Sequence, residues 1–184
     1  MVAVRVTGVH TVLARAVELP MSNKRIPPAP GQESVWDYPR PPLLERSDRR
    51  IEIWFGGEKI ADSRQTWRVL ETSHPPVYYI PASDIGQGVL RHADGTSFCE
   101  WKGTARYFDV VTDGQSAVKA AWSYPDPTEP FASIAGHVAF YPAQMDVCRI
   151  DGVDVQPQLG GFYGGWVTPE IVGPYKGEPG TSGW

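Results

Sequence analysis

The sequence lacks the features that mark several large classes of protein. Its 184 residues hold two cysteines, Cys99 and Cys148, and neither belongs to a C-x-x-C pair of the kind that builds zinc sites. No apolar run approaches the ~20 residues that span a bilayer. The formal net charge is −4 and basic residues form no run, which argues against a protein that coats nucleic acid. We therefore expect neither a membrane nor a nucleic-acid polymer as a partner.

Catalytic and metal-binding motifs are also scarce. The chain contains no G-x-x-x-x-G-K-[ST] phosphate loop and no G-x-S-x-G elbow, and its four histidines lack H-E-x-x-H spacing. We expect no metal and no cofactor. The spacing of the two cysteines allows a disulfide, but the absence of a secretory signal favours reduced thiols and a cytoplasmic protein.

Turn-forming residues and aromatic residues are abundant instead. Nineteen glycines and 18 prolines make up roughly a fifth of the chain, against about 12% in average usage. Seven tryptophans, eight tyrosines and six phenylalanines accompany them. This composition favours short strands joined by many turns over a helical bundle.

Alternating apolar residues predict an all-β domain. Ile51, Ile53 and Phe55 share one face of a strand, and the Gly-Gly pair after them favours a tight hairpin. Pro-flanked residues 77–80 indicate an edge strand, because proline cannot donate to a ladder. Short strands are expected at 50–55, 58–61, 67–72, 77–80, 96–100, 104–111, 116–123, 138–141, 145–150 and 153–155, with a helical turn at 131–134. The pattern fits an antiparallel, single-layered or barrel-like domain.

The chain divides into four parts on composition. Residues 1–20 are interpreted as an extension outside the core, although a first strand or amphipathic helix remains an alternative. Residues 21–49 form a Pro-rich arm, laid on the body through Trp36 and Tyr38. Residues 50–155 form the β core, and residues 156–184 form an irregular, Gly- and Pro-rich segment packed on it.

Two clusters carry potential chemistry. In Cys99-Glu-Trp-Lys-Gly, the ammonium of Lys102 is three residues from a thiol and would favour its thiolate form. Alternatively, Cys99 is a small core residue and Lys102 a solvated turn residue. Trp122 and Tyr124 alternate before a rigid Pro-Asp-Pro and suit a ligand cleft, or else belong to the core. His74 precedes two prolines and is either a positioned site residue or a structural one.

Several runs resemble a known family. They are CEWKGTARY at 99–107, AWSYPDP at 121–127 and VAFY at 138–141, with supporting stretches at 32–42, 71–76 and 160–166. In combination they are similar to the bacterial family named domain of unknown function 427. Glu100 departs from the family pattern, which has proline after the cysteine.

The resemblance implies a β-tent fold, in which two antiparallel sheets meet at an angle. Many β-tent proteins carry zinc on two C-x-x-C pairs, which this chain lacks. The family is sometimes described as nucleotidyltransferase-like, yet no Gly-Ser start followed by a D-x-D pair is present. The family's own activity is unknown, and the fold alone supplies none.

Two functional hypotheses follow. In the first, the protein binds a small anionic or nucleotide-like ligand in a cleft, with Lys102 pairing the anionic group. The residues that would form this cleft are Trp101, Lys102, Tyr107, Trp122, Tyr124 and His74. In the second, the protein is an enzyme that uses Cys99 as a thiolate nucleophile or redox centre, assisted by Lys102 or His74. The first is favoured, because no acid–base partner has a reliable spacing to Cys99.

Overall fold

The computed structural model describes residues 25–181. The extension expected at residues 1–20 lies outside them. The described chain is built from strands and turns, with short 3-10 helices at η1 (Ala82–Asp84), η2 (Glu129–Ile134) and η3 (Pro142–Gln144). The all-β prediction is confirmed, and no helix in this part of the chain is long and apolar enough to cross a membrane.

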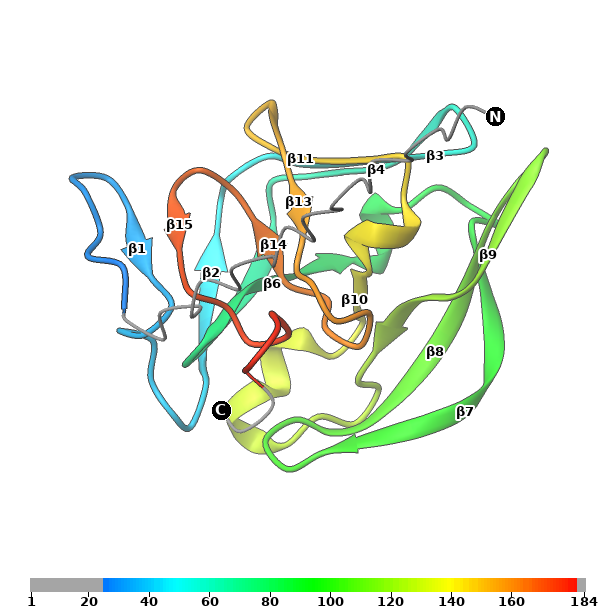
Figure 1. The fold of residues 1–184 in the computed structure, drawn as a ribbon. Coiled ribbons are helices and arrows are strands. Elements are labelled where there is room, and N and C mark those ends of the chain that lie inside the picture. Colours follow the sequence, from blue (N-terminus) through cyan, green and yellow to red (C-terminus); the bar gives the residue numbers. More distant parts are fainter. Residues whose placement is uncertain (1–24, 182–184) are drawn as a thin grey trace, which may run out of the picture.

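The largest sheet is open and has seven antiparallel strands, so the structure is not a barrel (Figure 1). In spatial order its strands are β2 (Leu43–Ser47), β5 (Thr66–Glu71), β6 (His74–Pro81), β10 (His137–Phe140), β9 (Gln115–Ser123), β8 (Gly103–Thr112) and β7 (Leu90–Cys99). The first of these, β2, lies within the residues assigned to the Pro-rich arm. The long β7–β8–β9 meander extends away from the body and carries the edge strand β7.

A second sheet of four strands meets the first at an angle (Figure 1). Its order is β12 (Val153–Asp154), β11 (Val147–Ile150), β3 (Ile51–Phe55) and β4 (Glu58–Ser63). The turn between β3 and β4 uses Gly56 and Gly57, whose φ angles of 61° and 78° suit the expected hairpin. The hairpin predicted at Asp151-Gly152 forms in the same way.

The prediction that residues 77–80 form an edge strand is wrong. They belong to β6, which lies inside the large sheet between β5 and β10. The prolines are tolerated because the ladders are incomplete around them. A register shift separates the Glu71–His74 and Val69–Val77 pairs with β5, and β10 pairs only with Ile80 and Pro81.

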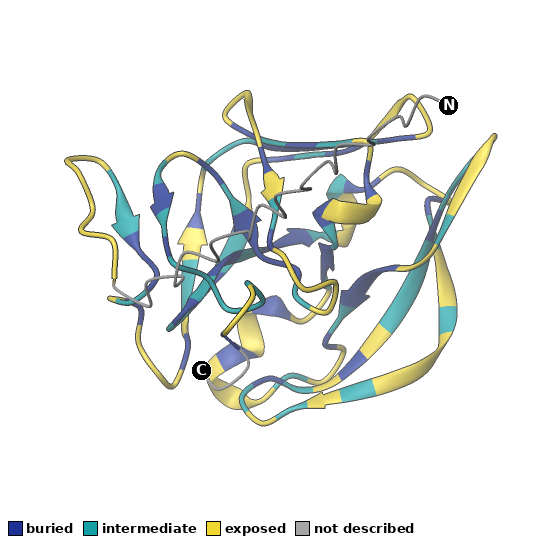
Figure 2. Ribbon diagram, viewed as in Figure 1, coloured by how far each residue is buried: buried dark blue, intermediate teal, exposed yellow. Residues whose placement is uncertain are grey.

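The main core fills the angle between the two sheets. Ile51, Ile53 and Phe55 point into it from the small sheet, as their alternation predicts, and all are fully buried. Ile80 and Phe140 meet them from the large sheet. Figure 2 shows buried residues concentrated on these strands, while the β7–β8 hairpin is mostly exposed or intermediate.

The arm and the C-terminal segment contact each other beside the large sheet. β1 (Glu33–Ser34) pairs in parallel with β15 (Ile171–Val172), and β13 (Gln156–Pro157) pairs with β14 (Trp166–Val167). Tyr38 is buried in a small cluster with Ile171, and the indole of Trp36 donates a 3.0 Å hydrogen bond to the carbonyl of Pro174. These contacts hold the C-terminal segment in place where it approaches the cavity described next.

Candidate ligand-binding cavity

A cavity of about 540 Å³ opens on the face of the large sheet that turns away from the main core. Its walls come from β6, the β7–β8 hairpin, the end of β9, and the loop between β13 and β14. The seven residues selected from the sequence all line it: His74, Cys99, Trp101, Lys102, Tyr107, Trp122 and Tyr124. The structure therefore brings them together, and their binding role stays a prediction.

The β7–β8 turn places three of these residues on the wall. β7 ends at Cys99, and the chain turns through residues 100–102 into Gly103, whose φ of 94° suits this tight turn, so the alternation of the strand does not continue. The carbonyl of Lys102 accepts a 3.3 Å hydrogen bond from the amide of Thr128, which ties the turn to the loop before η2. Cys99 and Lys102 consequently reach the same cavity, with Trp101 between them in sequence.

Lys102 is the least expected residue of the site, because only 9% of its surface is exposed. Its ammonium lies 5.7 Å from the ring centroid of Tyr124 and 5.7 Å from that of Phe131. Within residues 25–181 this ammonium has no carboxylate partner and no hydrogen bond. Burying a charge without an ion-pair partner is unfavourable, and the contacts of the ammonium with the two rings offset some of this cost.

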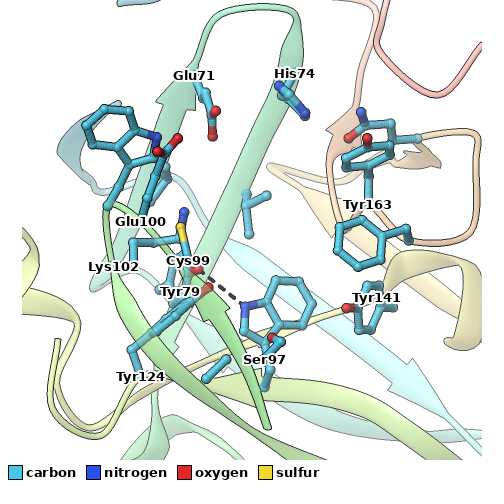
Figure 3. Close-up of a pocket in the computed structure, with 18 of the residues that line it drawn as sticks. Glu71, His74, Tyr79, Ser97, Cys99, Glu100, Lys102, Tyr124, Tyr141 and Tyr163 are labelled. Carbon is cyan, nitrogen blue, oxygen red and sulfur yellow. Dashed lines mark hydrogen bonds between the residues drawn. The ribbon is translucent and has the colours of Figure 1, made fainter. Parts of the chain in front are cut away.

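Further aromatic rings line the rest of the cavity. The indole of Trp122 donates to the hydroxyl of Tyr79 at 3.4 Å, the bond dashed in Figure 3. Its ring also packs against that of Tyr141, with the centroids 4.4 Å apart and the planes tilted by 43°. Figure 3 shows Lys102 and Cys99 on one side of the cavity and Tyr141 and Tyr163 on the other. Aromatic side chains are thus the most frequent kind on the cavity wall.

Three tyrosine hydroxyls of the wall, those of Tyr79, Tyr124 and Tyr141, keep their protons at neutral pH. Burial raises the pKa of Tyr79 and of Tyr124 above the ordinary tyrosine value. Burial, together with the neighbouring Tyr107, raises the pKa of Tyr141 to about 12. The hydroxyl of Tyr107 shares a 2.8 Å hydrogen bond with Ser97, whereas that of Tyr124 has no hydrogen-bond partner among the described residues. Tyr124 therefore offers a hydrogen-bond donor to a ligand.

His74 is held in one orientation by its backbone contact. Its Nδ1 lies 2.9 Å from the carbonyl of Thr72, a distance at which Nδ1 carries the proton and Nε2 is left as an acceptor. Burial lowers the pKa of His74, so the ring is neutral at pH 7. The ring meets that of Tyr163 edge-on, with the centroids 5.1 Å apart.

Sequence reasoning missed much of the opposite wall. Tyr79 and Tyr141 went unselected, as did the C-terminal residues Gln158, Phe162 and Tyr163. The run Gly-Gly-Phe-Tyr-Gly-Gly at 160–165 was the available signal. At Gly164 a Cβ atom would lie 2.2 Å from the Trp122 ring, so only glycine lets this loop close against the indole.

Cys99 reaches the cavity, but its thiol is not hydrogen-bonded to either residue proposed to assist it. It is half-buried, and its thiol makes no hydrogen bond to Lys102 or His74 within the described chain. Cys148 lies in the main core, where burial raises its thiol pKa. No group of three or more His, Cys, Asp or Glu residues capable of holding a metal gathers within residues 25–181.

Comparison with known proteins gives one family. The profile of the family described as Domain of unknown function (DUF427) matches residues 43–151, more than half of the chain. No curated protein shows a significant match. The matched region contains Cys99, Lys102, Trp122 and Tyr124, whereas the C-terminal wall of the cavity lies outside it.

Proposed function

The chain belongs to the family described as Domain of unknown function (DUF427), and from the cavity built largely by the matched residues we propose that the protein binds a small, flat, anionic molecule. The observation that carries this proposal is the buried Lys102 ammonium, which lines the cavity and forms no ion pair with any carboxylate of the described chain. Ligand sites of this size are usually lined by apolar and aromatic groups with few polar ones.

The walls support a flat ligand. Rings of tyrosine, tryptophan and phenylalanine present large, stiff surfaces that lose little conformational entropy when a ligand packs on them. The buried tyrosine hydroxyls supply hydrogen-bond donors, and the neutral ring of His74 supplies an acceptor, so neither adds charge to the cavity. The charged group that the ligand brings would then be paired mainly by Lys102.

The test is ligand binding by a variant that lacks the charge. In a thermal-shift screen, at least one of three probes, benzoate, 2-naphthoate and AMP, should bind the native protein and raise its melting temperature. Lys102→Met keeps the length of the side chain and removes the ammonium, so it should weaken binding of that probe at least tenfold, which calorimetry would measure.

Lys119→Met is the matched control. The Lys119 ammonium lies 6.0 Å from the Tyr107 ring centroid, and Lys119 does not line the cavity. Binding should be unchanged in this variant. The proposal fails if no flat anion binds the native protein, or if Lys102→Met binds the probe as tightly as the native chain does.

A second function keeps a specific observation in its favour. Cys99 lines the same cavity as Lys102 and is accessible from it, which supports the alternative of a thiolate enzyme assisted by Lys102 or His74. The rate of alkylation by iodoacetamide against pH tests it: a thiol that reacts well below its usual pH range would support an enzyme, and an inert thiol would contradict it.

The two unpaired cysteines also support a reducing compartment such as the cytoplasm.

A further inference from the structure

The charges on the cavity wall nearly balance. Three cationic side chains, of Arg40, Lys102 and Lys176, face two carboxylates, of Glu71 and Glu100. Arg40 and Glu71 form an ion pair at 2.7 Å, and His74 is neutral. Arg40 is thus paired and Lys176 has a contact of its own, which leaves the Lys102 ammonium as the cation of this wall that the described residues do not pair. A carboxylate brings one negative charge to this site, whereas a phosphate monoester brings roughly −1.5 to −2 at pH 7.

Two polar groups are poised for one anionic head. Lys102 and Tyr124 are 9% and 6% exposed, line the cavity and lack hydrogen-bond partners for their side chains within residues 25–181. The ammonium lies 5.7 Å from the centroid of the Tyr124 ring, so the two side chains are neighbours. An ammonium and a phenol donate to oxygen acceptors, and a carboxylate offers two such oxygens.

The mouth of the cavity favours an aromatic body behind that head. Phe98 and Phe162 line the cavity and are 78% and 72% exposed, which is unusual for such large apolar side chains. A flat apolar ring lodged between them and the Trp122–Tyr141 pair would remove this surface from water. An aliphatic or sugar-like body would gain less from the same walls.

We infer that the cavity selects aromatic monocarboxylates, with the carboxylate bound by the Lys102 ammonium and the Tyr124 hydroxyl, over neutral analogues and over phosphate esters. This inference rests on the proposed function and narrows it. The inference excludes mononucleotides as the preferred ligand class, because their phosphate would bring more negative charge than Lys102 balances, close to the carboxylate of Glu100.

Three probes with one ring system separate the possibilities. They are 2-naphthoate, 2-naphthamide and 2-naphthyl phosphate, titrated calorimetrically at pH 7 into the full chain. The native protein should bind the carboxylate at least tenfold more tightly than either other probe. In Lys102→Met the preference for carboxylate over amide should fall below threefold. Tyr124→Phe, which removes only the hydroxyl, should weaken carboxylate binding about three- to tenfold.

The outcomes distinguish this inference from the proposed function. If the phosphate ester binds as tightly as the carboxylate and needs Lys102, the inference is overturned while flat-anion binding stands. If the amide matches the carboxylate in the native protein, the Lys102–Tyr124 subsite does not exist. If no probe binds, the proposed function falls and this inference with it. Circular dichroism and melting temperatures of both variants establish that the fold is retained, and Tyr124→Phe keeps the test decisive if Lys102→Met does not fold.

Discussion

The two faces of the large sheet are built from the same strands and differ in what fills them. On β6, Tyr78 and Ile80 point into the main core while Tyr79 points toward the cavity side. On β10, Phe140 belongs to the core and Ala139 to the opposite face. Because successive residues of a strand face opposite sides, one segment stabilises the fold and shapes the site at once.

The contrast lies in chemistry as much as in position. The core between the sheets is mainly aliphatic and closed, whereas the other face gathers phenols and indoles around an open cavity. The polar tips of tyrosine and tryptophan rings need hydrogen-bond partners or solvent, which aliphatic side chains do not. Stability and binding are therefore expected to separate by face, even between adjacent residues.

Neighbouring residues on β10 and just after it give the sharpest test of this separation. Phe140 is fully buried in the core and Tyr141 is half-buried on the cavity wall. Phe140→Ala should lower the free energy of unfolding by about 3–5 kcal/mol, through lost burial and the void left behind. Tyr141→Ala should cost less than half as much, since its space already opens to solvent. Urea denaturation measures both, and equal costs would contradict the comparison.

Trp122 contributes both to stability and to the cavity wall, so its replacement should have an intermediate effect on stability. It is buried, donates to the hydroxyl of Tyr79 and still lines the cavity. Trp122→Ala should therefore lower stability by about 3 kcal/mol and also weaken binding of 2-naphthoate more than tenfold. Denaturation and calorimetry on the same preparation separate the two losses. If Trp122→Ala binds 2-naphthoate as tightly as the native protein does, the indole has no role in binding.

The smallest expected effect is on the pH dependence of stability, and it comes from one residue of the cavity face, His74. Burial lowers the pKa of folded His74 below the value of about 6.5 found in unfolded chains. Below pH 6.5 the unfolded state thus binds a proton that the folded state does not, and stability falls with decreasing pH until the folded-state pKa is passed. His74→Gln should flatten this part of the stability profile, and His137→Gln, at an exposed contact, serves as the control. An unchanged profile in His74→Gln would contradict the prediction.

Local signals predicted much of the fold. The Gly56-Gly57 and Asp151-Gly152 turns were found because two-residue hairpins demand residues that accept positive φ. The faces of β3 followed from strict alternation. The interior position of β6 could not be predicted in this way. The prolines show which backbone amides cannot donate hydrogen bonds. They do not show which neighbouring strand pairs with each half of β6.

The cavity was half predictable for a similar reason. Cys99, Trp101 and Lys102 are neighbours in sequence, and Gly103 indicated the turn that presents them. Tyr79 and the residues of the 158–164 loop became site residues only through long-range packing, against Trp122 above all. Periodicity assigns a residue to a face, while the identity of what lies opposite depends on the tertiary fold.

The close approach of Gly164 to Trp122 couples two events that look separate. The C-terminal loop forms the second wall of the cavity while Gly164 lies against the indole, so a ligand that contacted both walls would favour this arrangement over one with the loop displaced. By thermodynamic reciprocity, occupancy then protects the loop from opening by the same free energy that docking contributes to affinity. The ligand would stabilise the loop at residues 158–164. Its binding would be measured there as slower proteolytic cleavage or slower hydrogen exchange, at a distance from the anionic group of the ligand.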